Sequence, residues 1–335
     1  MPELRKDPVT GRWVIVSTDR AKRPSDFSRQ QVTITGLRFC PFCPGNELRT
    51  PSEILAYRTH GAANEPGWTL RVVSNKFPVL RVEGSVNRKG EGLYDKMNGV
   101  GAHEVIIESP DHMHTLATMP EKRIEDLFWA YRDRVLDLRR DVRLKYALLF
   151  KNHGEAAGQA LEHTHSQLIA LPVVPKRVEE ELDGAERHYE YKERCVYCDI
   201  IAQELDTATR VVLETDHFLA ICPYAARFPF ETWIIPKTHN SHAEMITHAE
   251  IEDLARLLQH VVRRMDSTLE RPPYNLVVHS APVQSSALQH YHWHIELIPK
   301  MTQVAGFEWG SGFYINPTPP EEAAKFMREA SVTTA

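Results

Sequence analysis

Apolar positions recur at helical spacing in two segments of the chain. Between residues 124 and 138 the apolar side chains return every three or four positions, which predicts an amphipathic helix. A similar stripe runs from Ile251 to Met265, and Thr247 and Glu250 in front of it form the pattern of a capping box. We therefore expect one long helix in each half, with its apolar face on a core.

Strand-like runs accompany both helices in the same order. The predicted strands are 103–107, 146–151 and 163–167 in the first half, and 230–235, 274–279 and 290–294 in the second. Landmarks that return in a fixed order indicate an internal repeat. The sequence thus predicts an α+β fold of two tandem units, each a sheet with one long amphipathic helix.

A Pro-bounded, charged stretch separates the two units. We predict an N-terminal domain over 1–172, a linker over 173–194 and a C-terminal domain over 195–335. The acidic run 179–181 within the linker is expected to be a solvated face, because such runs are rarely buried.

Four of the five cysteines form two Cys-x-x-Cys pairs, Cys40 with Cys43 and Cys195 with Cys198. In a reducing compartment such spacing favours metal binding over a disulfide. A thioredoxin-like redox pair is the rival interpretation, but we expect no helix directly after either pair.

Zinc prefers four thiolate or imidazole ligands in a tetrahedron. The first predicted set is Cys40, Cys43, His112 and His163. The second set is Cys195, Cys198, His239 and one of the last histidines. Aligning the two Leu-Ile pairs equates His163 with His292, whereas aligning Pro172 with Pro299 equates it with His290, and we prefer His292. Four protein ligands leave no open position for catalytic water, so both sites are expected to be structural.

Bulk composition narrows the functional classes. A formal net charge of −5 supplies no basic field for nucleic acid or an anionic membrane. The polar start of the chain and the lack of a run of about 18 apolar residues predict a soluble, cytoplasmic protein.

The segment 163–167 carries the candidate chemistry. On a strand, His163, His165 and Gln167 project to one face. If zinc holds His163, the neighbouring His165 has an imidazole nitrogen free to attack phosphorus, and Gln167 can donate a hydrogen bond to a phosphoryl oxygen. Upstream, the turn from Asn152 to Gly158 offers backbone amides to an anion.

These motifs together resemble the galactose-1-phosphate uridylyltransferase family, the duplicated branch of the histidine triad superfamily. The resemblance covers nearly the whole chain and rests on the segments 19–24, 40–43, 74–77, 109–112, 150–154 and 163–167. It implies two histidine-triad-like units with antiparallel sheets, and a homodimer.

The resemblance also implies roles for individual residues. His165 would attack the α-phosphorus of a nucleotide sugar and carry the nucleotidyl group until a second phosphate accepts it, while Gln167 stabilises that intermediate. The implied substrate-binding positions are Arg20, Arg23, Phe42, Asn75, Phe77, Asn152 and Glu308. Glu308 would contact sugar hydroxyls, within a segment that reaches the neighbouring subunit's site.

Several positions depart from the usual family pattern. Thr164 and Ser166 replace a proline and a glycine, and Ala160 replaces a phosphate-binding serine. Together with the segment 310–316, these changes resemble the branch that includes plant ADP-glucose phosphorylase. That branch favours the cysteine set for the second zinc, whereas bacterial uridylyltransferases would use Glu181, His279, His292 and His294.

The leading expectation is ping-pong transfer of UMP between UDP-glucose and galactose 1-phosphate, as part of galactose metabolism. The runner-up is adenylyl transfer from ADP-glucose to inorganic phosphate. A histidine triad hydrolase is less favoured, because Gln167 stands where hydrolases have a third histidine. The alternative from a different class is a zinc-stabilised module that binds nucleotides without catalysis. In that case His165→Ala should leave ligand affinity and biological activity largely intact.

Overall fold

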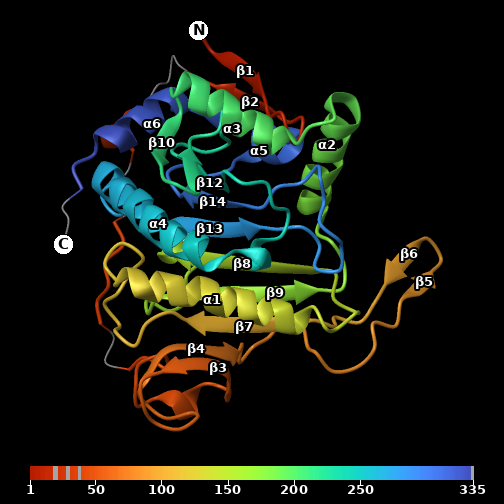
Figure 1. The fold of residues 1–335 in the computed structure, drawn as a ribbon, viewed down its shortest axis with the longest axis vertical. Coiled ribbons are helices and arrows are strands. Elements are labelled where there is room, and N and C mark those ends of the chain that lie inside the picture. Colours follow the sequence, from red (N-terminus) through yellow and green to blue (C-terminus); the bar gives the residue numbers. More distant parts are fainter. Residues whose placement is uncertain (18–21, 28–30, 37–38, 333–335) are drawn as a thin grey trace.

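A single antiparallel sheet of ten strands forms the centre of the molecule. The computed structural model describes residues 1–17, 22–27, 31–36 and 39–332. The first half contributes β3 (Glu53–Arg58), β4 (Trp68–Ser74), β7 (Ala102–Ile107), β8 (Tyr146–His153) and β9 (His165–Leu171). The second half contributes β10 (Val211–Glu214), β11 (Phe218–Ile221), β12 (Thr232–Pro236), β13 (Tyr274–His279) and β14 (His294–Pro299). The strand order is β10-β11-β12-β14-β13-β8-β9-β7-β4-β3 (Figure 1).

The two repeats meet at a seam between β8 and β13. These strands pair antiparallel, with Val277 opposite Phe150 and Asn275 opposite Asn152. On either side of the seam, the strands β9, β7 and β4 mirror β14, β12 and β11. The α+β fold of two tandem units is confirmed, and the two sheets are continuous.

Both expected helices lie side by side on one face of this sheet (Figure 1). They are α1 (Glu121–Leu138) and α4 (His248–Leu269). The capping box is present, because Thr247 Oγ1 accepts from the Glu250 backbone N–H and the Glu250 carboxylate accepts from the Thr247 backbone N–H. The apolar stripes of both helices pack into one core with the strand residues of that face. The opposite face carries the cysteine and histidine groups.

Two further helices correct the expectations for the middle of the chain. The predicted linker contains α2 (Lys176–Lys192), and Glu181 of the acidic run is buried, contrary to the expected solvated face. Helix α3 (Val196–Thr207) begins directly after Cys195, where we expected no helix. It forms because Val196, Tyr197 and Ile201 bury one side against the second half.

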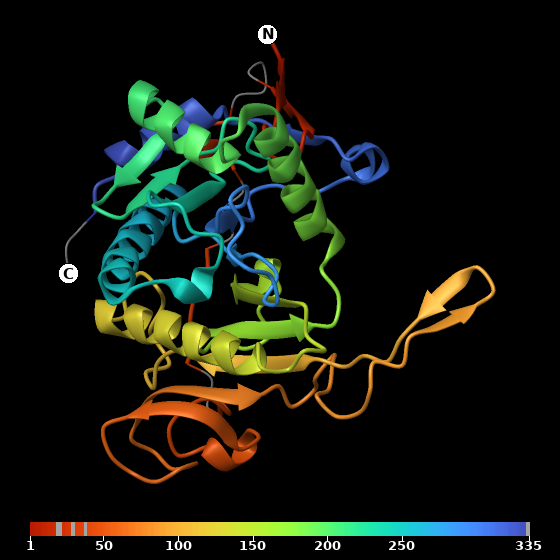
Figure 2. The same cartoon turned by 45° about the vertical axis from the view of Figure 1, so that its right-hand side comes forward.

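Smaller elements surround the sheet. The strands β1 (Glu3–Lys6), β2 (Trp13–Val16) and β15 (Tyr314–Asn316) form a separate sheet, and β5 (Lys89–Glu91) pairs with β6 (Tyr94–Lys96). The short helices are η2 (Pro24–Asp26), η3 (Glu47–Arg49), η4 (Glu155–Ala157), η5 (Ala243–Met245), α5 (Gly306–Ser311) and α6 (Pro320–Glu329). The β5–β6 hairpin projects from the body as an arm (Figure 2).

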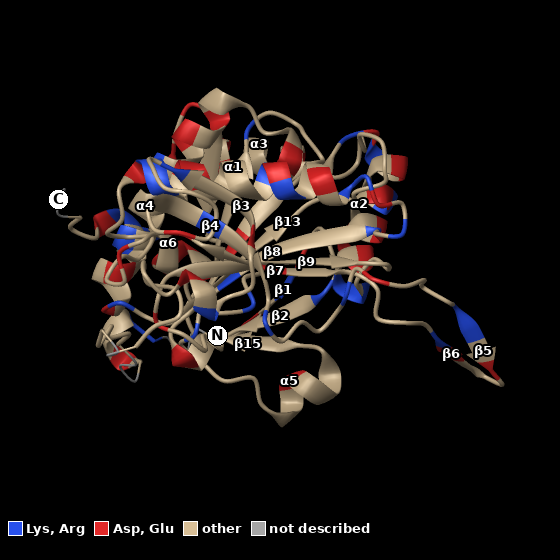
Figure 3. Cartoon of the chain, turned by 90° about the horizontal axis from the view of Figure 1, so that it is seen from below, with Lys and Arg blue, Asp and Glu red and all other residues tan. Residues whose placement is uncertain are grey.

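Charged residues of both signs are interspersed over the view in Figure 3, so no broad basic face is seen there. This agrees with the net charge of −5. In the described parts of the chain, no helix combines the length and apolarity needed to cross a bilayer.

Candidate active site and metal centres

His165 opens β9 with one ring nitrogen engaged and the other available. Its Nδ1 donates to the backbone carbonyl of His163 at 2.8 Å. Because Nδ1 carries the proton, the lone pair of the neutral ring lies on Nε2, which has no hydrogen-bond partner among the described residues. Burial, aided by the nearby Lys151 ammonium, lowers the pKa of His165. The ring is thus neutral, with its lone pair on Nε2 and its tautomer fixed by the backbone.

Phe42 and Gln167 lie beside this ring. Phe42 packs against His165 with ring centroids 5.3 Å apart. Gln167 Oε1 lies 2.8 Å from Nε2 of His103 on the neighbouring strand β7. His103 was missed as a site residue, because in the sequence it is only the first residue of a predicted strand.

Asn75 and Phe77 follow the end of β4 and approach the same histidine. Asn75 Nδ2 lies 3.0 Å from His103 Nε2, and Asn75 Oδ1 accepts from the backbone N–H of Phe77 at 2.9 Å. The Phe77 side chain is 82% exposed, so it presents a free apolar surface beside these polar groups.

The predicted anion-binding turn adopts a backbone that requires glycine. Gly154 and Gly158 have φ of +83° and +89°. Asn152 donates from Nδ2 to the Gly158 carbonyl at 3.3 Å, and Asn275 of the second half donates to Asn152 Oδ1 at 2.8 Å. A groove of about 1060 Å³ lies beside the turn, and the exposed Ala160 lines it. Asn275 is a second residue that the sequence did not identify.

A buried ion pair contacts the start of β9 beside His165. Lys151 Nζ donates to Glu108 Oε2 at 2.7 Å, to Thr164 Oγ1 at 2.9 Å and to the His165 carbonyl at 3.0 Å. The hydroxyls of Thr164 and Ser166 both donate to the Glu108 carboxylate. The Thr and Ser that interrupt the usual family motif are therefore the hydroxyls that satisfy this buried carboxylate.

The first predicted metal set comes together as expected. The donor atoms of Cys40, Cys43, His112 and His163 all lie within 4.8 Å of one another. Cys43 Sγ lies 3.3 Å from His112 Nδ1 and 3.6 Å from His163 Nδ1. His163 Nε2 donates to the Ser109 carbonyl at 2.7 Å, which turns Nδ1 toward the thiols.

The second set repeats this geometry and includes His292 rather than His290. The donor atoms of Cys195, Cys198, His239 and His292 also lie within 4.8 Å of one another. His292 Nε2 lies 2.8 Å from the Pro236 carbonyl, and His239 Nε2 lies 3.0 Å from the Leu288 carbonyl. Both clusters have the donor types and the outer hydrogen bonds of a metal site with four protein ligands.

The alternative ligand set for the second half is not formed as expected, because His292 lies with the cysteines and Glu296 takes its place. The resulting group is Glu181, His279, His294 and Glu296, all of them buried. His279 Nδ1 lies 3.1 Å from Glu181 and its Nε2 lies 3.4 Å from Glu296. Burial opposes protonation, but these two carboxylates raise the pKa of His279 to about 10.

A guanidinium also occupies this third group. Arg227 Nη2 lies 2.7 Å from Glu296 Oε2 and 2.8 Å from Glu231 Oε1. Arg227 and His279 thus already pair with these carboxylates, so a metal ion at this group would have to displace both contacts.

Two predicted substrate residues, Glu308 and Arg23, stand apart from this constellation, and a third falls outside the described residues. Glu308 lies on α5, which projects from the body (Figure 3), and its carboxylate accepts from the Ala305 backbone N–H at 3.0 Å. Arg23 is exposed at the start of η2. Arg20 lies outside the described residues.

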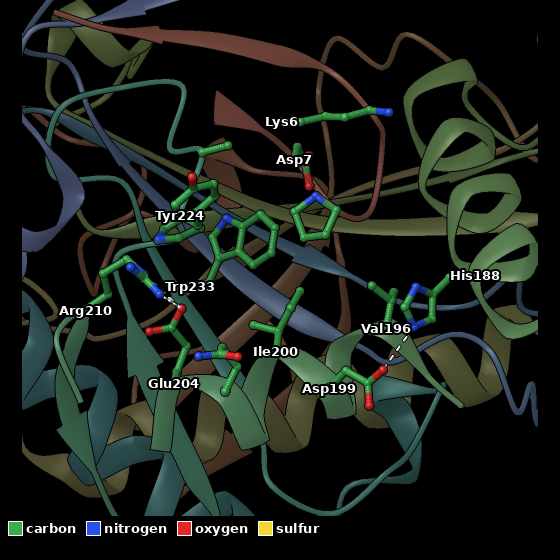
Figure 4. A pocket seen from close by; sticks show the side chains of 14 residues that line it. Lys6, Asp7, His188, Val196, Asp199, Ile200, Glu204, Arg210, Tyr224 and Trp233 are labelled. Atoms are coloured by element: carbon green, nitrogen blue, oxygen red, sulfur yellow. Dashed lines mark hydrogen bonds and ion pairs between the residues drawn. The ribbon is translucent and has the colours of Figure 1, made fainter. Parts of the chain in front are cut away.

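A second, more apolar pocket of about 490 Å³ lies in the C-terminal half. Ile200 and Trp233 line it, with the ion pairs His188–Asp199 and Arg210–Glu204 on opposite sides (Figure 4). Neither His165 nor Gln167 lines this pocket, so its position does not identify the reactive centre.

Comparisons with known proteins find relatives over nearly the whole chain. The model of the galactose-1-phosphate uridyl transferase N-terminal domain matches residues 1–175, and that of the C-terminal domain matches residues 181–326. The chain is 39% identical to ADP-glucose phosphorylase of Arabidopsis thaliana, over 99% of this chain and 94% of the relative. It is 34% identical to galactose-1-phosphate uridylyltransferase of Thermotoga maritima, over 99% of both chains.

Solved structures give the same relationship. The crystal structure of Arabidopsis thaliana ADP-glucose phosphorylase with bound ADP-glucose superposes with a TM-score of 0.85 at 38% identity, covering 99% of this chain and 100% of that one. A uridylyltransferase structure superposes with a TM-score of 0.76 at 29% identity, covering 98% and 97%. The chain therefore belongs to the galactose-1-phosphate uridyl transferase family and is an enzyme of the nucleotidyltransferase type.

Proposed function

We propose that this enzyme transfers a nucleoside monophosphate group from a nucleotide sugar to a second phosphate through a covalent intermediate on His165. The observation that carries the proposal is the tautomer of His165, whose Nδ1–H is bound to the His163 carbonyl. This hydrogen bond leaves the Nε2 lone pair for attack.

In the first step, Nε2 forms a bond to the α-phosphorus and the bond from that phosphorus to the bridging oxygen breaks, which releases sugar 1-phosphate. The positive charge that develops on the ring is stabilised by the Nδ1–H bond to the His163 carbonyl at 2.8 Å. In the second step, an oxygen of the acceptor phosphate attacks the same phosphorus and the ring leaves as a neutral imidazole. Gln167 stabilises the transferring group by donating its amide hydrogens to a phosphoryl oxygen.

We assign substrate-binding roles to residues near this centre and to three others. Phe42, Asn75 and Phe77 form the nucleoside side, and Asn152 with the Gly158 turn forms the phosphate side. Arg20, Arg23 and Glu308 complete the assignment by family position. Glu308 serves the active site of a second copy, since α5 projects from its own body and exposes Phe307 and Trp309. We therefore propose a homodimer, which light scattering after gel filtration measures directly.

Zinc is the metal that the donor set of both cysteine clusters fits best, and the proposed compartment is a reducing cytoplasm that keeps the thiols available. When bound, zinc would fix His163 and thereby the carbonyl that orients His165. With all four ligands supplied by protein, its role is structural.

For the donor, ADP-glucose with inorganic phosphate as acceptor is the substrate pair that the comparisons favour. The identity to the Arabidopsis phosphorylase, 39%, exceeds the 34% to the Thermotoga uridylyltransferase. The solved phosphorylase structure also superposes with a higher TM-score, 0.85, than the uridylyltransferase structure at 29% identity, 0.76. The second candidate is UMP exchange between UDP-glucose and galactose 1-phosphate, which the Thermotoga relative supports over 99% of both chains.

Intact-protein mass spectrometry tests the proposal. Wild type is mixed separately with ADP-glucose and with UDP-glucose, and His165→Ala serves as the control. An AMP adduct on wild type alone supports adenylyl transfer, and a UMP adduct supports uridylyl transfer. No adduct from either donor, or an equal adduct on His165→Ala, contradicts the covalent mechanism.

A further inference from the structure

We propose that His103 is a positioning residue that determines which end of the Gln167 amide faces the substrate phosphate. This inference rests on the proposed role of Gln167 in phosphoryl stabilisation. A side-chain amide stabilises a phosphoryl oxygen only when its NH₂ end points there, because its carbonyl oxygen would repel the same charge.

Strand register brings the two side chains together. In the β7–β9 pair, His103 lies opposite Ile169 and Val105 lies opposite Gln167, so His103 and Gln167 are diagonal neighbours. Such neighbours point to the same face and reach one another when the side chains are long. The His103 Nε2 to Gln167 Oε1 distance is 2.8 Å, and the histidine is 9% exposed.

The backbone fixes the tautomer of His103. The amide N–H of Val79 lies 3.3 Å from His103 Nδ1, and a backbone N–H can only donate. Nδ1 is therefore the acceptor, and the proton of the neutral ring lies on Nε2. Nε2–H in turn donates to Gln167, so the group of Gln167 that faces His103 is the carbonyl oxygen.

The Val79 contact thus favours the orientation in which the carbonyl oxygen of Gln167 faces His103. With Oε1 bound to His103, the NH₂ group of Gln167 points away from the histidine and remains free to donate. Asn75 Nδ2 lies 3.0 Å from the same Nε2 and, because its Oδ1 accepts from the Phe77 N–H, it presents a second donor there. This donor opposes the Nε2–H tautomer, which the Val79 N–H on Nδ1 and the shorter 2.8 Å contact with Gln167 Oε1 favour. One ring therefore contacts both Gln167 and Asn75, the residues assigned to the phosphate and nucleoside sides.

Two substitutions at His103 test the contacts of the two ring nitrogens separately. In His103→Gln, the side-chain NH₂ reaches the position of Nε2–H and still donates to Gln167. In His103→Asn, the side chain reaches only the position of Nδ1. It therefore keeps the contact with the Val79 N–H and loses the hydrogen bond to Gln167. We expect the single-turnover rate of nucleotidyl-enzyme formation to fall about tenfold to a hundredfold in His103→Asn, and to stay within about threefold of wild type in His103→Gln.

A double substitution distinguishes positioning from a general structural effect. If His103 acts through Gln167, adding His103→Asn to Gln167→Ala lowers the rate little beyond Gln167→Ala alone. Losses that multiply in the double variant, or equal rates for His103→Asn and wild type, overturn the inference. A wild type that forms no adduct instead contradicts the proposed function.

Imidazole ¹⁵N chemical shifts of wild type give a readout that requires neither turnover nor a variant that folds. We expect the Nε2–H tautomer for His103. An Nδ1–H tautomer would overturn the inference even if the enzyme is active.

Discussion

Asn275 donates from its side-chain nitrogen to Asn152 Oδ1 at 2.8 Å across the seam between the two halves. Its second contact is the Ala157 carbonyl at 2.9 Å, so it also ties down the turn between Gly154 and Gly158. The C-terminal half therefore orients Asn152, which the N-terminal half supplies and to which we assign a role in substrate binding. The Asn152 amide is left with its NH₂ group toward the Gly158 carbonyl.

We predict that Asn275→Ala slows nucleotidyl-enzyme formation about threefold to tenfold, because one net hydrogen bond of about 1 kcal/mol no longer orients Asn152. Asn275→Asp should be worse, since a carboxylate would face Asn152 Oδ1 and lose both donors. Stopped-flow or quench-flow single turnovers measure the rates. Equal rates for wild type and both variants would show that Asn152 needs no support from the second half.

Removing one member of the Lys151–Glu108 pair should destabilise the protein more than removing both. Both side chains are fully buried, so Lys151→Met leaves an unpaired carboxylate and should lower the free energy of unfolding by about 3–5 kcal/mol. The double variant Lys151→Met with Glu108→Leu should recover part of this loss. Urea unfolding of the three proteins tests the prediction, and a double variant no more stable than Lys151→Met contradicts it.

The order of sequence landmarks was sufficient to identify both cysteine–histidine clusters, because metal ligands recur with fixed spacing and the repeat identified which histidines correspond. It could not identify His103 or Asn275. Their partners, Gln167 and Asn152, are 64 and 123 residues away, and only the register of paired strands brings them together. Helix α3 was missed because its buried side depends on tertiary contacts with the second half.

Metal analysis should find two zinc ions per chain. Cys43→Ser and Cys198→Ser should each remove one ion and leave the other, because the two ligand groups share no residue. Elemental mass spectrometry after dialysis measures the content. Loss of both ions from either variant would contradict this prediction, and would show that removing one ion unfolds the sheet that carries both clusters.

No third ion is expected at Glu181, His279, His294 and Glu296, since Arg227 already neutralises the Glu296 carboxylate. Arg227→Met provides the test. It removes the guanidinium, but the His279 imidazolium still lies between Glu181 and Glu296 and should still exclude a cation, so the metal content should stay at two ions. A third equivalent in wild type would contradict the assignment of this group as an ion-pair cluster.

Asp266 on α4 predicts a specific pH dependence of stability. Burial raises the pKa of its carboxyl to about 7, despite the opposing charge of Arg271, and Oδ1 has no hydrogen-bond partner in the described chain. A carboxyl with a raised pKa favours folding below its unfolded pKa of about 3.9, and this contribution is lost as the pH rises to about 7.

Asp266→Asn should therefore be more stable than wild type at pH 8, by a few kcal/mol at most, and the difference should shrink toward pH 4. Thermal unfolding of both proteins from pH 4 to pH 8 gives the comparison. A difference that stays constant across this range would show that Asp266 does not titrate as described.

The seam between β8 and β13 links the stability of the two halves, and with it the two cysteine–histidine clusters. Five residue pairs join these strands, and the helices α1 and α4 share one core above them, so neither half exposes its edge without disrupting the other. An ion bound to Cys195 and Cys198 stabilises the folded state of the whole sheet by mass action. By reciprocity, occupancy at either cluster raises the apparent affinity of the other whenever unfolding competes with binding. An ion held by Cys195 and Cys198 would therefore stabilise the half that carries His165, although none of its ligands belongs to that half.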